Sequence, residues 1–174
     1  MKQFIMLVAY LLTIATVLVI VSCRSVPTAP DGAVRAICAA EAMLPAGQLY
    51  HSDAPEGSPE YLPPALLATA YGIPDGYGGI EKAAVRLSGN GHPCEFAVFL
   101  CKDADTAEDV SLFCKNRLRS LSLNASFSAN EIGMSREEYD AYLSSAAIII
   151  SGRYVAFIIS SDVPAARRAF IKAI

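Results

Sequence analysis

The sequence has few charged side chains and no excess of basic ones. Charged residues make up 18% of the 174 residues, and 17 acidic against 14 basic residues give a formal net charge of −3 at pH 7. Nucleic-acid binding requires a basic patch that displaces counterions, so this balance argues against a nucleic-acid partner. Hydrophobic residues make up 53% of the chain, which is enough to form a buried core and argues against disorder.

The common catalytic and metal-binding patterns are missing as well. The chain contains no G-x-S-x-G, S-x-x-K or H-E-x-x-H motif, which removes the usual hydrolase signatures. His51 and His92 are the only histidines, and each lies in a loop rich in proline or glycine. Each is either a solvated loop histidine or a base or metal ligand, and neither has a Cys, Asp or Glu at ligand spacing. The sequence therefore predicts no catalytic residue, cofactor or metal site.

Cysteine occurs five times, once at the end of an apolar run and four times in the body of the chain. Cys94 and Cys101 are seven residues apart on one predicted strand, so their side chains point to opposite faces and match no zinc pattern. We predict four reduced, mostly buried thiols in the domain, with a disulfide as the alternative in an exported protein. These four residues are Cys38, Cys94, Cys101 and Cys114.

The N-terminal segment is a long apolar run. Residues 4–21 carry no charge, and as a helix they span about 27 Å, just enough to cross a bilayer core. The sequence I-V-S-C at 20–23 resembles the bacterial lipobox, in which the cysteine receives diacylglycerol and the preceding peptide bond is cut. Cys23 is therefore the predicted lipidation site. The alternatives are a retained transmembrane helix, because a secretory signal has an apolar region of only about 7–15 residues, and ordinary secretion.

Three segments follow from this interpretation. Residues 1–22 form a signal or membrane anchor, and residues 23–32 form a tether, because two prolines and small polar residues favour an extended spacer. Residues 33–174 have a normal length for one domain. Both leading alternatives for the anchor place this domain at the cell membrane, on its extracytoplasmic side, with the membrane contacted through the N-terminus.

The first part of the domain predicts helices separated by a loop. Residues 50–64 contain four prolines and are predicted to form the loop. The predicted helices are Ala33–Leu44, stopped by Pro45 and Gly47, and Ala65–Tyr71, closed by Gly72 in a left-handed conformation.

From residue 83 the pattern predicts two copies of a β-β-α unit. The first has strands at 83–88 and 94–102 and a helix from 106 to about 121, and the second has strands at 147–151 and 154–160 and a helix from 163. Asn90-Gly91 and Gly152-Arg153 favour tight hairpin turns, and the predicted helix caps are Asp105 with Glu108, Ser135 with Glu138, and Asp162.

The economical architecture is α+β, with a four-stranded antiparallel sheet, helices on one face of it and N-terminal helices before it. The helix from 106 supports this arrangement, because it presents one apolar stripe, formed by Val110, Cys114, Leu118 and Leu121.

Two features are candidate contact surfaces. Tyr71 precedes the glycine-rich segment D-G-Y-G-G at 75–79, and Tyr77 lies within it. Arg153-Tyr154 lies at the second hairpin. These residues either form an aromatic contact surface or cover the edge of the core. The glycine run does not predict a phosphate site, because a strand follows it and not a helix N-terminus with a basic residue.

Several runs resemble a known family. They are Y-G-I (71–73), E-K-A-A-V-R-L-S, E-F-A-V-F-L-C-K-D-A-D-T-A-E-D-V, and A-I-I-I-S-G-R-Y-V-A-F-I-I-S-S-D. Together they resemble the domain of unknown function 4358 family, which comprises anchored or lipoprotein-like bacterial proteins, over roughly residues 33–174. The resemblance implies an exported location and one compact α+β domain, and it carries over no catalytic residue.

We expect a membrane-anchored extracytoplasmic module, held as a lipoprotein, that binds a protein or a cell-envelope component and has no chemistry of its own. The rival hypothesis is an envelope-associated hydrolase or small-ligand receptor. A pocket with a pKa-shifted carboxylate or histidine would favour the rival. An exposed aromatic or apolar patch of several hundred Å² would favour the binding module.

Overall fold

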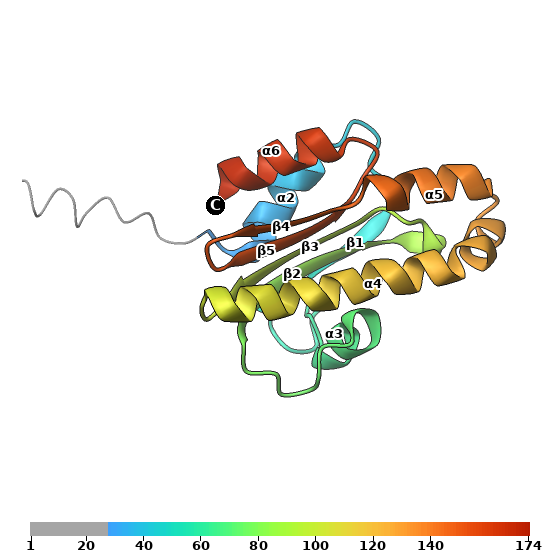
Figure 1. The fold of residues 1–174 in the computed structure, drawn as a ribbon. Helices are drawn as coiled ribbons and strands as arrows, with labels where there is room; N and C mark the ends of the chain where they lie inside the picture. The colour runs from blue at the N-terminus through green and yellow to red at the C-terminus, as the bar shows by residue number, and fades with distance from the viewer. Residues whose placement is uncertain (1–27) are drawn as a thin grey trace, which may run out of the picture.

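The computed structural model describes residues 28–174, which form five strands and five α-helices (Figure 1). The strands are β1 (Gly47–His51), β2 (Ile80–Ser88), β3 (Glu95–Cys101), β4 (Ala147–Ser151) and β5 (Tyr154–Ile159). The helices, labelled as in Figure 1, are α2 (Pro30–Ala40), α3 (Pro64–Tyr71), α4 (Ala104–Glu131), α5 (Arg136–Ser145) and α6 (Val163–Ala173). The predicted α+β class is confirmed.

All five strands belong to one antiparallel sheet with the order β1-β2-β3-β5-β4. The hairpins β2–β3 and β4–β5 meet along their second strands, so that Glu95 lies opposite Ile159. Each hairpin is followed by a helix, which confirms the two β-β-α units. In the first turn Asn90 and Gly91 have φ values of 55° and 76°, the left-handed conformation that Asn-Gly hairpin turns adopt.

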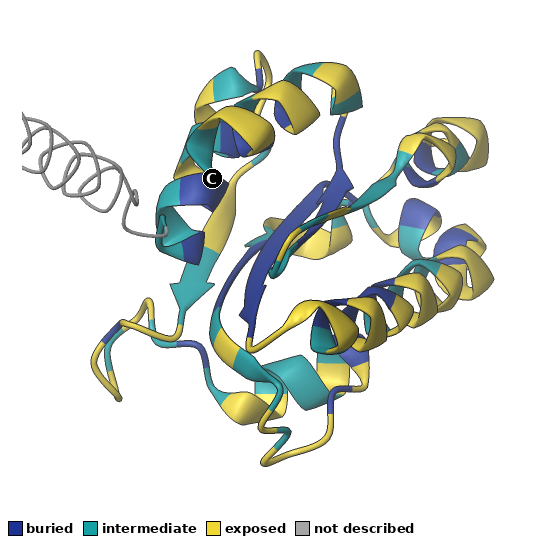
Figure 2. Cartoon of the chain, turned by 60° about the vertical axis from the view of Figure 1, so that its left-hand side comes forward, coloured by how far each residue is buried: buried dark blue, intermediate teal, exposed yellow. Residues whose placement is uncertain are grey.

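Helices cover both faces of the sheet, so the prediction of helices on one face was wrong. On one face Val110 of α4 belongs to the same apolar cluster as Phe99 of β3, and α3 packs beside α4. On the other face Ile37 of α2 and Phe170 of α6 cluster with Phe96. Figure 2 shows the central strands in dark blue between these two helix layers.

The physical reason lies in the two central strands. Every residue of β3 is buried, and so is every residue of β5 after Tyr154. A sheet with one solvated face shows alternating apolar and polar residues, whereas a continuous apolar run indicates burial on both faces. The runs E-F-A-V-F-L-C and Y-V-A-F-I-I therefore required cover on both sides.

The sheet also has a fifth strand, β1, which the prediction of four strands missed. β1 pairs with β2 from Gly47 opposite Ser88 to His51 opposite Ala84. It lies at the edge of the sheet and is exposed or half-buried throughout, so it has no clear apolar alternation. Its last residues fall inside the stretch that was predicted to be a proline-rich loop.

Two helices differ in extent from the prediction. α2 begins at Pro30, which is buried, so residues 30–32 fold with the domain although they were assigned to the tether. α4 runs to Glu131, well past the predicted end near residue 121, because no glycine or proline interrupts it. Its N-cap is Asp103, whose side chain accepts a hydrogen bond from the Thr106 N–H, and not Asp105 as predicted.

The other predicted caps are confirmed. Gly72 closes α3 with a φ of 69°, and Asp162 caps α6 by accepting a hydrogen bond from the Ala165 N–H. Ser135 and Glu138 form a capping box at the start of α5, in which each side chain bonds to the other residue's N–H.

The four domain cysteines are free thiols, as predicted. Cys94, Cys101 and Cys114 are buried, and Cys38 is half-buried. Cys94 and Cys101 belong to the apolar clusters on opposite faces of the sheet, as the strand alternation requires.

Candidate functional site

Buried charge gathers at one end of the sheet. Among residues 28–174 the buried charged residues are Glu41, Arg86 and Glu95. Arg86 lies near the end of β2 and Glu95 begins β3, while Glu41 follows α2 and contacts Ser160 just after β5. Burying a charge is costly unless it is paired, so an end that holds three of them is a candidate functional region.

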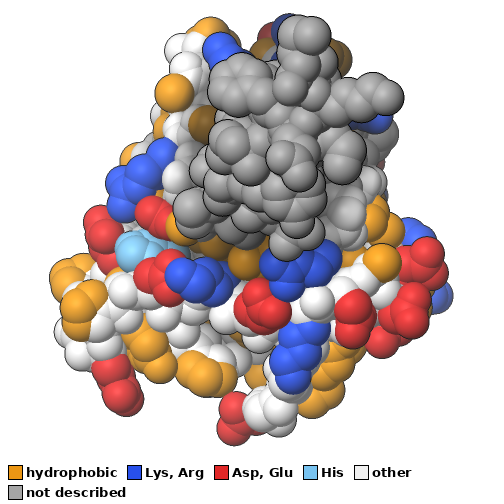
Figure 3. All heavy atoms as spheres, turned by 90° about the vertical axis from the view of Figure 1, so that its left-hand side faces the viewer, with side chains coloured by type: hydrophobic (Ala, Val, Ile, Leu, Met, Phe, Trp, Pro, Cys, Tyr) orange, Lys and Arg blue, Asp and Glu red, His pale blue; other side chains and the backbone are white. Residues whose placement is uncertain are grey.

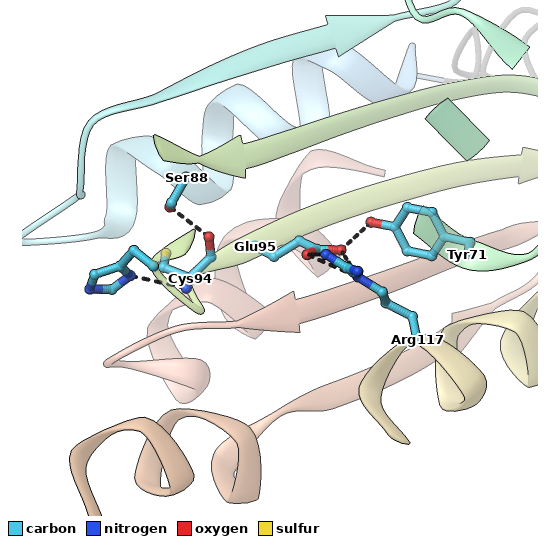
Figure 4. A network of polar contacts seen from close by, with 6 residues as sticks. Tyr71, Ser88, Cys94, Glu95 and Arg117 are labelled. Atoms are coloured by element: carbon cyan, nitrogen blue, oxygen red, sulfur yellow. Dashed lines mark hydrogen bonds and ion pairs between the residues drawn. The ribbon is translucent and has the colours of Figure 1, made fainter. Parts of the chain in front are cut away.

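Glu95 is the centre of the network in Figure 4. The Tyr71 hydroxyl donates a 2.5 Å hydrogen bond to Glu95 Oε1, and Arg117 Nη2 donates one of 2.7 Å to Oε2. Arg117 Nε lies 3.3 Å from Oε1 and 3.2 Å from Oε2. Burial, followed by the charge of Glu95, raises the pKa of Tyr71 well above 10, so its hydroxyl remains a donor. The carboxylate is thus fully engaged and is not free to act as a general base.

Three elements bring this network together. Strand alternation places Glu95 on the face of β3 that α4 covers, together with Phe99. Arg117 lies three residues after the buried Cys114 and therefore on the sheet-facing side of α4. Tyr71 ends α3 and packs edge-to-face on Phe99 with ring centres 5.5 Å apart. The ion pair thereby ties α3 and α4 to the start of β3.

A cavity of about 170 Å³, which we call the polar cavity, lies beside the network. Tyr139 of α5 lines it and is 1% exposed, and its hydroxyl has no hydrogen-bond partner within residues 28–174. Arg117 Nη1, whose side chain also lines the cavity, makes no hydrogen bond in the same part of the chain. Two donors therefore face the cavity without an acceptor. The wall consists of Leu87, Ser88, Gly91, His92, Pro93, Glu95, Arg117, Leu121, Ser128 and Tyr139.

The groups at this cavity that could react are held in other bonds. The Cys94 N–H donates to His92 Nδ1 at 3.1 Å, so the neutral ring carries its proton on Nε2 and presents a donor. The Ser88 hydroxyl donates to the Cys94 carbonyl at 2.6 Å (Figure 4). The Cys94 thiol does not line the cavity but lies in the apolar cluster on the opposite face of the sheet, where burial raises its pKa to about 11 and makes it a poor nucleophile.

Arg86 lies behind the wall of the polar cavity. Its Nη1 donates to Ser88 Oγ at 3.1 Å, and its Nη2 donates to the Pro45 carbonyl. Glu41 does not pair with it but accepts hydrogen bonds from Ser160 and Ser161. Arg86 has no carboxylate within ion-pair distance in the described part of the chain.

A second cavity, which we call the tyrosine groove, lies at the opposite end of the sheet and has a volume of about 340 Å³. Tyr77 is half-buried and packs edge-to-face on Phe113 at 5.6 Å. Lys82 at the rim pairs with Asp53 at 2.9 Å. The groove is therefore mainly apolar and its rim charge is already matched. Its apolar wall consists of Tyr61, Leu62, Pro64, Leu67, Ile73, Pro74, Tyr77 and Ile80.

The tyrosines predicted as a contact surface have different fates. Tyr71 is 2% exposed, so its assignment to such a surface was wrong and the alternative, a role in the core, is confirmed. Tyr77 lines the tyrosine groove. The Tyr154 hydroxyl donates to the Thr28 carbonyl at 2.9 Å, and Arg153 pairs with Glu81 at 3.0 Å. Both residues join separate segments at the edge of the core.

The two histidines lie apart. His92 lines the polar cavity, whereas His51 ends β1, with its Nε2 3.4 Å from Glu60 Oε2. Within residues 28–174 no three His, Cys, Asp or Glu side chains gather in a way that could hold a metal ion. No helix in that range is both long and apolar enough to cross a membrane. Cys23 and the apolar run at 4–21 lie outside the described residues.

Sequence reasoning missed the polar cavity. Glu95 carried a signal, because it is the only charged residue of an otherwise apolar strand. Arg86 carried a weaker one, because β2 also contains Glu81 and Lys82. Arg117 carried none, since α4 has many polar residues and 22 positions separate it from Glu95. Tyr139 carried no signal either, and only the packing of α5 against α4 shows that it is buried.

Comparisons with known proteins returned no relatives: no family model matches the chain, no curated protein matches its sequence, and no solved structure matches its fold. The resemblance to the domain of unknown function 4358 family stays a prediction.

Proposed function

We propose that this protein is a membrane-anchored extracytoplasmic binding module, and that it takes a small ligand in the polar cavity. The observation that carries this proposal is Tyr139, whose side chain lines the cavity and whose hydroxyl makes no hydrogen bond to residues 28–174. The hydroxyl is not among the fully buried unpaired atoms of that range, so it is open to the space of the cavity. A polar group that faces a cavity without a protein partner is suited to bond to a ligand in place of water.

The arrangement favours binding over catalysis. A nucleophile needs an adjacent base, but Ser88 donates its proton to a backbone carbonyl and the Cys94 thiol is buried and protonated. His92 Nδ1 already accepts a hydrogen bond from the Cys94 N–H, and Glu95 is neutralised by Arg117. No residue at this cavity is poised to attack or to take a proton from a substrate. Burial lowers the pKa of His92, which supports a small-ligand site at this cavity over a module that binds only macromolecules.

The membrane anchor is proposed from the sequence, on the apolar run at 4–21 and the lipobox-like I-V-S-C at 20–23. In Figure 3 the visible part of one face intersperses acidic and basic side chains. Clustered Lys and Arg side chains attract anionic lipids, whereas a surface of mixed charge attracts them little. This face therefore gives no support for a second membrane contact, and we assign attachment to residues 1–23.

The intact mass of protein extracted from membranes tests the anchor. Lipidation at Cys23 predicts a mature chain that starts at Cys23 and carries acyl chains, and a Cys23→Ala variant that accumulates as the uncut precursor. A wild-type species that retains residues 1–22 without acyl addition leaves a transmembrane anchor instead. Recovery of unmodified protein from the soluble fraction would contradict membrane anchoring.

Ligand binding is tested by thermal unfolding of the full chain in detergent against a collection of small polar metabolites. A ligand at about 100 times its dissociation constant stabilises the folded state by roughly 2.7 kcal/mol. We expect at least one compound to raise the unfolding temperature of the wild type but not that of Tyr139→Phe. Tyr50→Phe is the matched control, because Tyr50 is half-buried against the same core but lines neither cavity. Stabilisation that is equal in all three proteins would contradict the assignment of this cavity.

A further inference from the structure

We propose that the ligand of the polar cavity is a small monocarboxylate. This inference rests on the proposed function and adds the chemical class of the ligand. It follows from the kinds of hydrogen-bonding groups in the wall, from the charge around them and from the volume they enclose.

Two groups in the wall can donate to a ligand. The Tyr139 hydroxyl makes no hydrogen bond to the described residues, and Arg117 Nη1 can only donate. The His92 ring packs edge-to-face on Tyr142 with ring centres 5.1 Å apart and is not counted with them. A ligand that accepts from both donors must supply acceptor oxygens, and a carboxylate supplies two without bringing a donor of its own.

The acidic group in the wall does not oppose such a ligand. Glu95 accepts from both Tyr71 and Arg117, so its charge is already compensated by the guanidinium and a hydroxyl. Glu95 occupies the Nε and Nη2 side of Arg117, which leaves Nη1 for a second acceptor.

The surrounding charge is balanced, which favours a ligand of low charge. Glu95 pairs with Arg117, and behind the wall Arg86, whose Nη1 lies 3.1 Å from the hydroxyl of Ser88, is offset by the buried Glu41. A monocarboxylate brings one negative charge to this end of the sheet, whereas a phosphate dianion would bring twice that charge.

The volume limits the ligand to a small molecule. At about 170 Å³ the cavity is smaller than pockets for drug-sized ligands, which have volumes of about 300–1,000 Å³. Short-chain carboxylates from formate to butyrate fall in the permitted range, and the apolar wall residues Leu87 and Leu121 suit a short alkyl chain.

The test is an NMR titration of the full chain in detergent micelles with formate, acetate, propionate and butyrate at constant ionic strength. Propionamide and inorganic phosphate serve as probes of charge and of anion type. We expect saturable shifts for at least one carboxylate at the amides of the β2–β3 turn and α5. Tyr139→Phe should weaken that binding by about tenfold to a hundredfold, the value of one hydrogen bond to a charged group. Tyr50→Phe should leave it unchanged.

Other outcomes separate the two proposals. If propionamide or phosphate binds more tightly than every carboxylate and Tyr139→Phe weakens it, the cavity binds ligands but the carboxylate assignment is wrong. If carboxylates bind equally to the wild type and to Tyr139→Phe, the assignment of the site is wrong. If no probe shifts these amides and the metabolite collection stabilises nothing, both the inference and the proposed function fail.

Discussion

The two β-β-α units share one order of elements but differ in content. The first, β2-β3-α4, contains the buried Arg86 and Glu95 and the arginine that pairs with Glu95. The second, β4-β5-α6, has only aliphatic and aromatic residues among its buried strand positions. The buried charges of the sheet are thus confined to the strands of the first unit. The second unit supplies mainly core, and its buried polar residue is Ser160, which follows β5 and donates to Glu41. Such a division is expected when one part of a domain serves a ligand and the rest holds it in place.

The units also send their helices to opposite faces of the sheet. Residues 102–103 join β3 to α4, whereas 160–162 join β5 to α6. Successive residues of an extended chain point to opposite sides, so one additional linker residue suffices to direct the next helix to the other face. A repeated order of elements therefore does not imply a repeated placement in space.

The largest effect is expected from breaking the ion pair of the first unit. Arg117→Ala leaves Glu95, which is 4% exposed, without its cation, and should lower the free energy of unfolding by about 3–5 kcal/mol. Arg136→Ala is the control, because Arg136 pairs with Asp140 on an exposed helix face, where such pairs contribute at most about 1 kcal/mol. Urea denaturation of both variants measures the difference. Equal losses would mean that the Glu95 pair is not buried.

In the second unit the matching test is the truncation of a buried apolar side chain. Phe170→Ala should cost about 3–5 kcal/mol, because Phe170 of α6 is fully buried against the sheet face opposite α4. Ile171→Ala, one position further, should change stability by less than about 0.5 kcal/mol, since Ile171 is half-exposed. If denaturant melts show the reverse order, α6 does not cover that face.

Removing one tyrosine hydroxyl from each half of the sheet should give smaller losses of stability, and the two losses should differ. Tyr71→Phe removes a 2.5 Å hydrogen bond to a buried carboxylate and should cost about 1.5–3 kcal/mol. Tyr154→Phe removes a bond to the Thr28 carbonyl and should cost about 1 kcal/mol. Calorimetric unfolding of the two variants gives the comparison. A larger loss for Tyr154→Phe would contradict the assigned importance of the Glu95 network.

His92 adds a modest pH dependence to the first unit. Burial, then the positive charge of Arg86, lowers the pKa of His92 below 6.5 in the folded state. The unfolded chain therefore binds the proton more readily, so this contribution to stability is complete above about pH 6.5 and declines as the pH falls toward the folded pKa. Unfolding free energies between pH 7.5 and 5.5 should decrease more steeply for the wild type than for His92→Gln. Parallel curves would place His92 in solvent.

Local signals in the sequence predict much of the fold and little of the site. The hairpin at Asn90-Gly91 and the caps at Ser135 and Asp162 were predictable, because turns and helix ends depend on neighbouring residues. The continuous apolar strand from Glu95 to Cys101 also contained the information that the sheet has two covered faces.

The polar cavity depends on residues that are distant in sequence. Glu95, Arg117 and Tyr139 come from three elements, and their contacts arise only when α4 and α5 pack beside the β2–β3 turn. Nothing local to E-E-Y-D-A-Y distinguishes a buried tyrosine from an exposed one, because its capping box and charged neighbours are equally typical of a solvated helix. An unpaired hydroxyl is a property of the assembled core.

The central claim is that the Tyr139 hydroxyl is present for a ligand and not for the fold. Its most direct test is the free energy of unfolding of Tyr139→Phe without ligand, measured by urea denaturation of the full chain in detergent. Because the substitution removes a hydroxyl that bonds to no residue in 28–174 and keeps the buried ring, the variant should be as stable as the wild type to within about 1 kcal/mol. A loss of more than about 1 kcal/mol would show that the hydroxyl stabilises the folded protein, and would contradict its assignment to a binding site.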